Sequence, residues 1–110
     1  MKVVRWDESA WAFSAEKLAK VGLFSTERFF LDLYCLEPGQ SQKPHAHAGS
    51  DKVYLVAAGR GRFRVGDDER ELGAGEAVMA GAGEVHGIRN DSGARLVVLT
   101  LMAPPPEKHA

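Results

Sequence analysis

From residue 29 onward, apolar residues come in short runs that are separated by glycine-rich or polar turns. The first run, residues 29–36, mixes aromatic and aliphatic side chains and stops at Glu37, Pro38 and Gly39, which predict a turn. Similar short runs cover residues 52–58, 60–65, 69–72, 76–80, 85–89 and 94–102. Short strands at this close spacing, with no helical pattern among them, are typical of an all-β sandwich or barrel.

The N-terminal part of the chain shows a different pattern. Residues 14–22 predict a short helix, with Ser14 as its N-cap and Gly22 as its stop signal. Before it, Trp6 and Trp11 add much aromatic surface, so we expect this segment to pack on the barrel or on a second subunit. We therefore divide the chain into an N-terminal extension with a short helix (residues 1–26), a barrel (27–103) and a flexible tail (104–110).

Composition and charge narrow the class of protein. The chain has 110 residues, a formal net charge of -1 and 45% hydrophobic residues, which describe one globular domain with its own core. This charge gives no electrostatic case for nucleic acid or an anionic membrane as a partner. No apolar run approaches the roughly 20 residues that span a bilayer, and the first residues lack the apolar core of a signal peptide. The single cysteine, Cys35, excludes an intrachain disulfide and suits the cytoplasm; its strand parity with Leu33 predicts a small buried hydrophobe.

Three histidines carry the candidate chemistry. Side chains two residues apart in an extended segment project from the same face, so His45 and His47 form a pair that His86 can join from elsewhere in the fold. Three neutral imidazoles are nitrogen donors for a divalent metal, and zinc, iron, nickel, copper and manganese are all compatible. The alternative is a metal-free barrel in which the histidines bind an organic ligand or form internal hydrogen bonds. We expect His109, in the proline-rich tail, to be solvated.

Two spaced motifs surround these histidines. One motif of a glycine, five residues, His-x-His and a closing glycine falls on Gly39, His45, His47 and Gly59. A second motif of two glycines, a histidine and an asparagine falls on Gly75, Gly83, His86 and Asn90. With these two motifs, residues 39–90 resemble the cupin family, although Gly81 stands where that family usually has proline.

The resemblance implies a double-stranded β-helix, that is a jelly-roll barrel, in a chain that forms a homodimer. It also implies that the motif histidines line the barrel interior and hold one metal. Residues 49–54 and the closing Ala103 and Pro104 look like those of small single-domain bacterial cupins. The family hosts many chemistries, so the resemblance names neither a reaction nor a catalytic residue. We expect Asn90 to cap a turn.

The chain departs from the family pattern at the metal-binding glutamate. Counting back from Gly59 by the family's six-residue spacing places Lys52 at that position, whereas Asp51 fits the spacing from His47. Adjacent strand residues face opposite sides, so only one of the two faces inward unless a bulge intervenes. The glycine register favours Lys52, whose charge would weaken a metal unless burial makes the amine neutral. An inward Asp51 would complete a site of three histidines and one carboxylate, and three histidines alone still hold zinc with an open position.

Two more residues are candidates for the pocket. Tyr54 shares strand parity with Lys52 and reaches either the cavity or the core, and Gln40 follows the motif glycine and either touches a ligand or forms part of a turn.

Two functions remain open. One is a metal-dependent enzyme on a small organic substrate, such as an oxygenase, isomerase or decarboxylase. The other is a non-catalytic module that binds or senses a small molecule.

Overall fold

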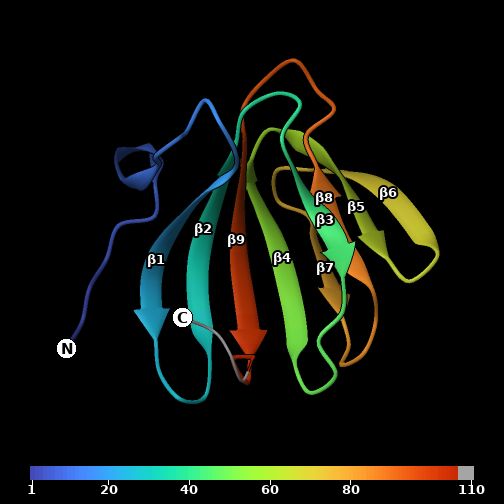
Figure 1. Cartoon of the computed structure of the whole chain (residues 1–110). Coiled ribbons are helices and arrows are strands. Elements are labelled where there is room, and N and C mark those ends of the chain that lie inside the picture. The colour runs from blue at the N-terminus through green and yellow to red at the C-terminus, as the bar shows by residue number, and fades with distance from the viewer. Residues whose placement is uncertain (107–110) are drawn as a thin grey trace.

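The computed structural model describes residues 1–106 and consists of two antiparallel β-sheets that face each other (Figure 1). A five-stranded sheet has the order β1-β2-β9-β4-β7, and a four-stranded sheet has the order β3-β8-β5-β6. The strands are β1 (Ala19–Ser25), β2 (Phe30–Leu36), β3 (Ser41–His45), β4 (Asp51–Ala58), β5 (Arg60–Val65), β6 (Asp68–Gly73), β7 (Ala77–Ala80), β8 (His86–Arg89) and β9 (Leu96–Ala103). The predicted all-β jelly-roll barrel is therefore confirmed.

Side chains from both sheets fill the interior of the barrel. The central cluster combines Tyr34 of β2 and Tyr54 of β4 with Phe63 of β5 and Ile88 of β8, all of them buried. Along β4, buried and less buried residues alternate, which is the period of a strand with one face inward. The inward face of β4 is therefore the face that carries Lys52 and Tyr54.

A second cluster lies on the outer face of the five-stranded sheet. Leu33, Cys35 and Val97 are fully buried there, and Trp11 and Phe13 of the N-terminal segment pack against them. The segment thus covers part of the barrel, as expected, although the Trp6 side chain stays 52% exposed. Cys35 is confirmed as a buried hydrophobe.

The helix predicted for residues 14–22 is wrong. Strand β1 covers the second half of this segment and pairs with β2 from Ala19 opposite Cys35 onward. The short helical element is instead a 3-10 turn, η1 (Glu8–Ala10). Ser14 Oγ does accept a hydrogen bond from the Glu16 backbone N–H at 3.2 Å, as a capping residue would, but no helix follows it. A helix this short is marginal by itself, and the hydrogen bonds to β2 outweigh it.

Asn90 caps the turn that leads from β8 to β9, as expected. Its fully buried side chain donates from Nδ2 to the carbonyl oxygens of Leu36 at 3.1 Å and Ala94 at 2.8 Å. Its Oδ1 accepts from the backbone N–H and the hydroxyl of Ser92 at 3.1 and 2.7 Å. These bonds tie the end of β2 to the turn that starts β9.

Within residues 1–106, no helix has the length and apolar content needed to cross a membrane. The expectations of a flexible tail over residues 104–110 and of a solvated His109 fall largely on residues 107–110, which lie outside the described residues.

Candidate metal centre

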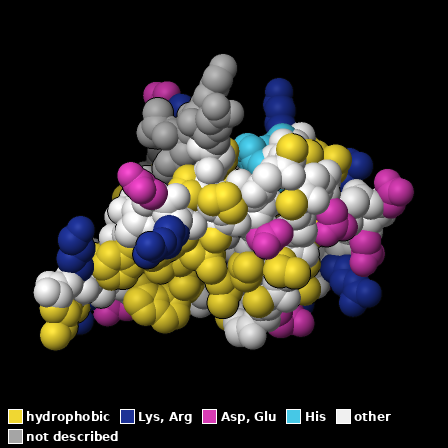
Figure 2. All heavy atoms as spheres, turned by 90° about the horizontal axis from the view of Figure 1, so that it is seen from below, with side chains coloured by type: hydrophobic (Ala, Val, Ile, Leu, Met, Phe, Trp, Pro, Cys, Tyr) yellow, Lys and Arg dark blue, Asp and Glu magenta, His cyan; other side chains and the backbone are white. Residues whose placement is uncertain are grey.

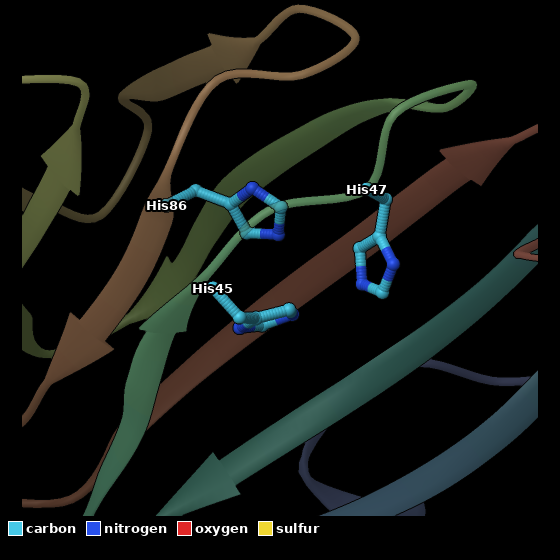
Figure 3. Close-up of side chains that lie close together, drawn as sticks. All are labelled: His45, His47 and His86. Carbon is cyan, nitrogen blue, oxygen red and sulfur yellow. The ribbon is translucent and has the colours of Figure 1, made fainter.

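The three motif histidines meet at one end of the barrel. His45 is the last residue of β3, His86 is the first residue of β8, and the two are register partners across the sheet. His47 lies two residues beyond the end of β3, yet its ring points back toward the other two (Figure 3). The ring centroids are 4.4 Å apart for His45 and His86, 4.8 Å for His45 and His47, and 5.7 Å for His47 and His86. One ligand nitrogen from each ring falls within 4.8 Å of the other two.

Backbone carbonyl groups fix the orientation of two of the rings. His45 Nδ1 lies 2.9 Å from the Lys43 carbonyl oxygen, and His86 Nδ1 lies 3.1 Å from the Glu84 carbonyl oxygen. A carbonyl only accepts, so each Nδ1 must carry the proton and each Nε2 must present its lone pair. His86 Nε2 is buried and has no hydrogen-bond partner among residues 1–106. A buried nitrogen of this kind is costly unless something binds it.

The local electrostatics favour the neutral form of His86 and His47. Burial is the main cause that lowers the pKa of His86 to about 4; the charges of Lys52, His45 and His47 act in the same direction, and a hydrogen bond to the Glu84 backbone acts against them. Burial also lowers the pKa of His47, followed by the effects of His45, Lys52 and Lys20. A metal ion binds neutral imidazole, so both rings are in the binding form at pH 7. Three imidazoles, one of which carries the orphaned Nε2 of His86, fit a divalent transition metal with at least one position left open.

The structure answers the question of the missing acid. Lys52 points into the barrel and is 2% exposed. Asp51 faces outward, where its Oδ1 accepts a hydrogen bond from the Ala82 backbone N–H at 3.0 Å. A lysine therefore occupies the inward position, as the glycine register favoured, and the Asp51 carboxylate is not part of the histidine cluster.

Tyr54 lies near both His86 and Lys52. Its ring centroid is 6.2 Å from that of His86 and 5.2 Å from Lys52 Nζ. Its hydroxyl donates a 2.9 Å hydrogen bond to Oε1 of Gln42, and Lys52 Nζ donates to the same oxygen at 3.4 Å. The structure thus brings Tyr54 and Lys52 together beside the histidine triad.

Gln42 is a site residue that sequence reasoning missed. Counted along an ideal strand, it has the opposite parity to His45 and would face outward. The pairing of β3 with β8 shifts register between Gln42 and His45, and this irregularity turns the Gln42 side chain inward. Nothing in the local sequence other than Pro44, which cannot donate to a sheet, signals such a shift.

Gln40 belongs to a turn and does not join this group. Its Oε1 accepts a 2.8 Å hydrogen bond from the Glu37 backbone N–H, and its Nε2 donates to the Ser14 carbonyl oxygen at 2.7 Å. Both polar atoms of the side chain therefore connect the N-terminal segment to the turn after β2.

The comparisons with known proteins agree with this geometry. The Cupin domain family matches residues 32–102, which is more than half of the chain and includes all three histidines. No curated protein sequence matches the chain.

Several crystal structures share the fold over nearly the whole chain. The protein TT1209 from Thermus thermophilus is 43% identical, with 94% of this chain and 98% of that chain covered and a TM-score of 0.90. An RmlC-like cupin from Desulfovibrio desulfuricans is 25% identical, with coverage of 96% and 98% and a TM-score of 0.83. A protein with a double-stranded β-helix domain from Klebsiella pneumoniae is 20% identical, with coverage of 94% and 91% and a TM-score of 0.86. The chain therefore belongs to the cupin family, as a small single-domain member.

Proposed function

We propose that this cupin binds one divalent metal ion through His45, His47 and His86 and binds or transforms a small organic molecule at that metal. The observation that carries the proposal is the buried Nε2 of His86, a lone pair without a hydrogen-bond partner among residues 1–106 that lies beside two further imidazoles. A metal bound there would act as a Lewis acid on a substrate oxygen or activate water or dioxygen.

The chain's own residues would support this function in distinct ways. The carbonyl oxygens of Lys43 and Glu84 hold two rings with Nε2 available. His45 and His47 are only half-buried, so the open side of the triad faces solvent and admits a ligand. Tyr54 and Gln42 line the inner side and fix the position of Lys52 next to whatever binds.

One observation favours a second candidate function, a metal-free module that binds or senses a small molecule. Lys52 occupies the place of the family's acidic ligand, and its positive charge opposes a metal ion in the same interior. In this alternative the three histidines contact an organic ligand directly. The two functions differ in whether the protein takes up metal and in whether the ligand is converted.

A cobalt(II) titration of chelator-treated protein under oxygen-free conditions tests the metal proposal. We expect a visible cobalt absorption band that saturates at about one equivalent per chain. In His86→Ala the affinity for cobalt should fall roughly a hundredfold or more, because a direct ligand contributes more than the 10- to 100-fold effect of a residue that only supports a ligand. Asp51→Asn is the matched control and should bind cobalt like the native protein, because Asp51 faces outward. A native protein that shows no saturable cobalt band would leave the metal-free module as the better account.

We also propose that the chain forms a homodimer. Support comes from large apolar side chains that remain exposed in the N-terminal segment, with Val3 80% and Trp6 52% exposed. On the adjoining outer face of the five-stranded sheet, Met79 is 60% exposed. Viewed from one end of the barrel, hydrophobic side chains form a broad band across this surface (Figure 2). Exposed apolar area of this kind is typical of a protein–protein interface.

A further inference from the structure

We infer that the barrel binds a small organic carboxylate beside the histidine triad, with the Lys52 ammonium holding a carboxylate oxygen. The inference rests on the proposed function and deepens it by naming the chemical class of the ligand. It follows from the side chain that stands where the family has an acid, and from the charges around that side chain.

Lys52 is a buried cation that its neighbours compensate only in part. Its hydrogen bond to Gln42 Oε1 is long, at 3.4 Å, and this oxygen also accepts the shorter hydrogen bond from Tyr54. The rings of Tyr34 and Tyr54 lie with their centroids 5.3 and 5.2 Å from Nζ. Such ring contacts contribute about 0.5–2 kcal/mol each, less than the several kcal/mol that a buried ion loses on leaving water. Burial accordingly lowers the pKa of Lys52 to about 8, still above neutral pH.

Two charged side chains act on Lys52 in opposite directions. They are the ammonium of Lys20, whose Nζ lies 5.1 Å from the centroid of the Tyr34 ring, and the carboxylate of Asp32. Lys20 is exposed, so water screens its charge, and the positive charge inside the barrel is that of the buried Lys52 ammonium together with that of any divalent metal on the histidines. Attraction between opposite charges is strong in an interior of low dielectric constant. The barrel is therefore suited to a ligand that brings negative charge.

The two buried tyrosines do not supply this charge. Burial raises the pKa of Tyr34 to about 12 and raises the pKa of Tyr54 as well. Both phenols stay protonated at neutral pH and act as hydrogen-bond donors. Their rings, with Val98 and Phe63, also give the interior an apolar wall, which suits an organic anion better than a strongly hydrated inorganic one.

The same small molecule can reach both Lys52 and the histidines. The Tyr54 ring centroid lies 6.2 Å from that of His86 and 5.2 Å from Lys52 Nζ. Both groups are thus within the reach of one small ligand that contacts this ring. Histidine side chains reach the surface in Figure 2, and His45 and His47 are only half-buried, so the ligand would approach the triad from this surface.

Isothermal titration calorimetry at pH 7 tests the inference. Malonate and pyruvate serve as carboxylate probes, malonamide and acetone as their neutral counterparts, and inorganic phosphate as the competing anion, each with zinc-loaded and with metal-free protein. We expect only the carboxylates to bind appreciably, and we expect Lys52→Met and Lys52→Gln each to weaken this binding at least tenfold. Lys2→Met is the matched control, because it removes an exposed ammonium from the N-terminal segment, and it should bind carboxylates like the native protein.

Carboxylate binding that both Lys52 variants leave unchanged would overturn the inference, and so would tighter binding of phosphate than of either carboxylate. Circular dichroism verifies that each variant is folded, and the two different substitutions guard against a defect peculiar to one of them. The two metal states separate this inference from the metal proposal. Carboxylate binding that depends on Lys52 in a protein that takes up no zinc would defeat the metal proposal alone, whereas zinc uptake without carboxylate binding would defeat this inference alone.

Discussion

At the scale of single residues, Lys52 determines the charge of the site, because it stands where the family has an acidic ligand. A carboxylate at that position would offset the charge of a metal, whereas the ammonium adds to it. His86 and His47 respond to the same surroundings, because burial and neighbouring positive charge lower the pKa of both rings. The site thus combines candidate metal ligands with a buried cation, and the histidine cluster includes no carboxylate within the described residues.

We predict that Lys52→Met raises the stability of the metal-free protein. The folded pKa of Lys52, about 8, is below its ordinary value of 10.5, so the unfolded chain holds this proton more tightly. A pKa shift of this size means that the buried charge destabilises the folded state by about 3 kcal/mol. The variant also loses the hydrogen bond that Lys52 donates, so we expect its free energy of unfolding to rise by about 1–3 kcal/mol at pH 7. The gain should be complete below pH 8 and should shrink as the pH rises toward 10.5.

Urea unfolding with a chelator present, measured from about pH 6 to about pH 10.5, checks this prediction. The dependence of the unfolding free energy on urea concentration should not change, because the variant buries a similar surface area. A variant that is less stable than the native protein at pH 7 would show that the Lys52 ammonium is well compensated by its neighbours.

At the scale of elements, short strands and turns could be predicted from the sequence, but the finer course of the backbone could not. Residues 60–65 form β5 as predicted, because alternation and glycine boundaries are local signals. The strand β1 was missed, since its pairing with β2 is a long-range interaction that overrides a weak helical pattern. The shift in β3 that turns Gln42 inward was missed for the same reason, because only the pairing with β8 shows it. The histidine cluster itself could be predicted, because the two sequence motifs contain all three of its residues.

Gly87→Ala should disturb the candidate metal centre through the backbone. A Cβ atom on Gly87 would lie 2.9 Å from the Gln42 carbonyl oxygen and 3.1 Å from the backbone N and Cα of Pro44, so β3 would have to move away from β8. These two strands carry His45 and His86. We expect a loss of about 1–3 kcal/mol in stability, which is typical of overpacking, together with weaker metal binding.

Gly49→Ala provides the matched control. Gly49 lies in the loop between β3 and β4, and a Cβ there would have no heavy atom of the described chain within 4 Å. Its stability should stay within about 0.5 kcal/mol of the native value. Chemical unfolding and cobalt titration of both variants make the comparison; equal behaviour of the two would mean that the spacing of β3 and β8 does not control the site.

At the scale of the whole molecule, the two sheets present different outer faces. The four-stranded sheet carries arginine–carboxylate pairs, which include Arg60 with Glu71 at 3.1 Å and Arg89 with Glu69 at 3.2 Å. Exposed pairs of this kind add little stability, but they keep that face hydrated. The five-stranded sheet instead carries apolar residues, and a hollow of about 690 Å³ lined in part by Trp6 and Trp11 adjoins it. If the chain forms the proposed homodimer, this difference favours the five-stranded side as its interface.

We predict that the protein has twice the chain mass in light scattering and that the combined variant Val3→Ser with Trp6→Ser shifts it toward the monomer. The reason is the removal of apolar area from the exposed N-terminal segment. Lys2→Ser changes an exposed polar residue of the same segment and should leave the mass unchanged. A native protein that is monomeric at micromolar concentration would contradict the proposed homodimer.

The central claim is that the three motif histidines hold a metal ion, and the most direct test is elemental analysis of untagged protein purified without chelator. Native protein and Asp51→Asn should each contain about one transition-metal atom per chain, and His47→Ala and His86→Ala should contain almost none. The element found would also direct the search for chemistry toward oxygen activation or Lewis-acid catalysis. A folded native protein without stoichiometric metal, even after oxygen-free reconstitution, would contradict the account and would show that Lys52 has disabled the metal site.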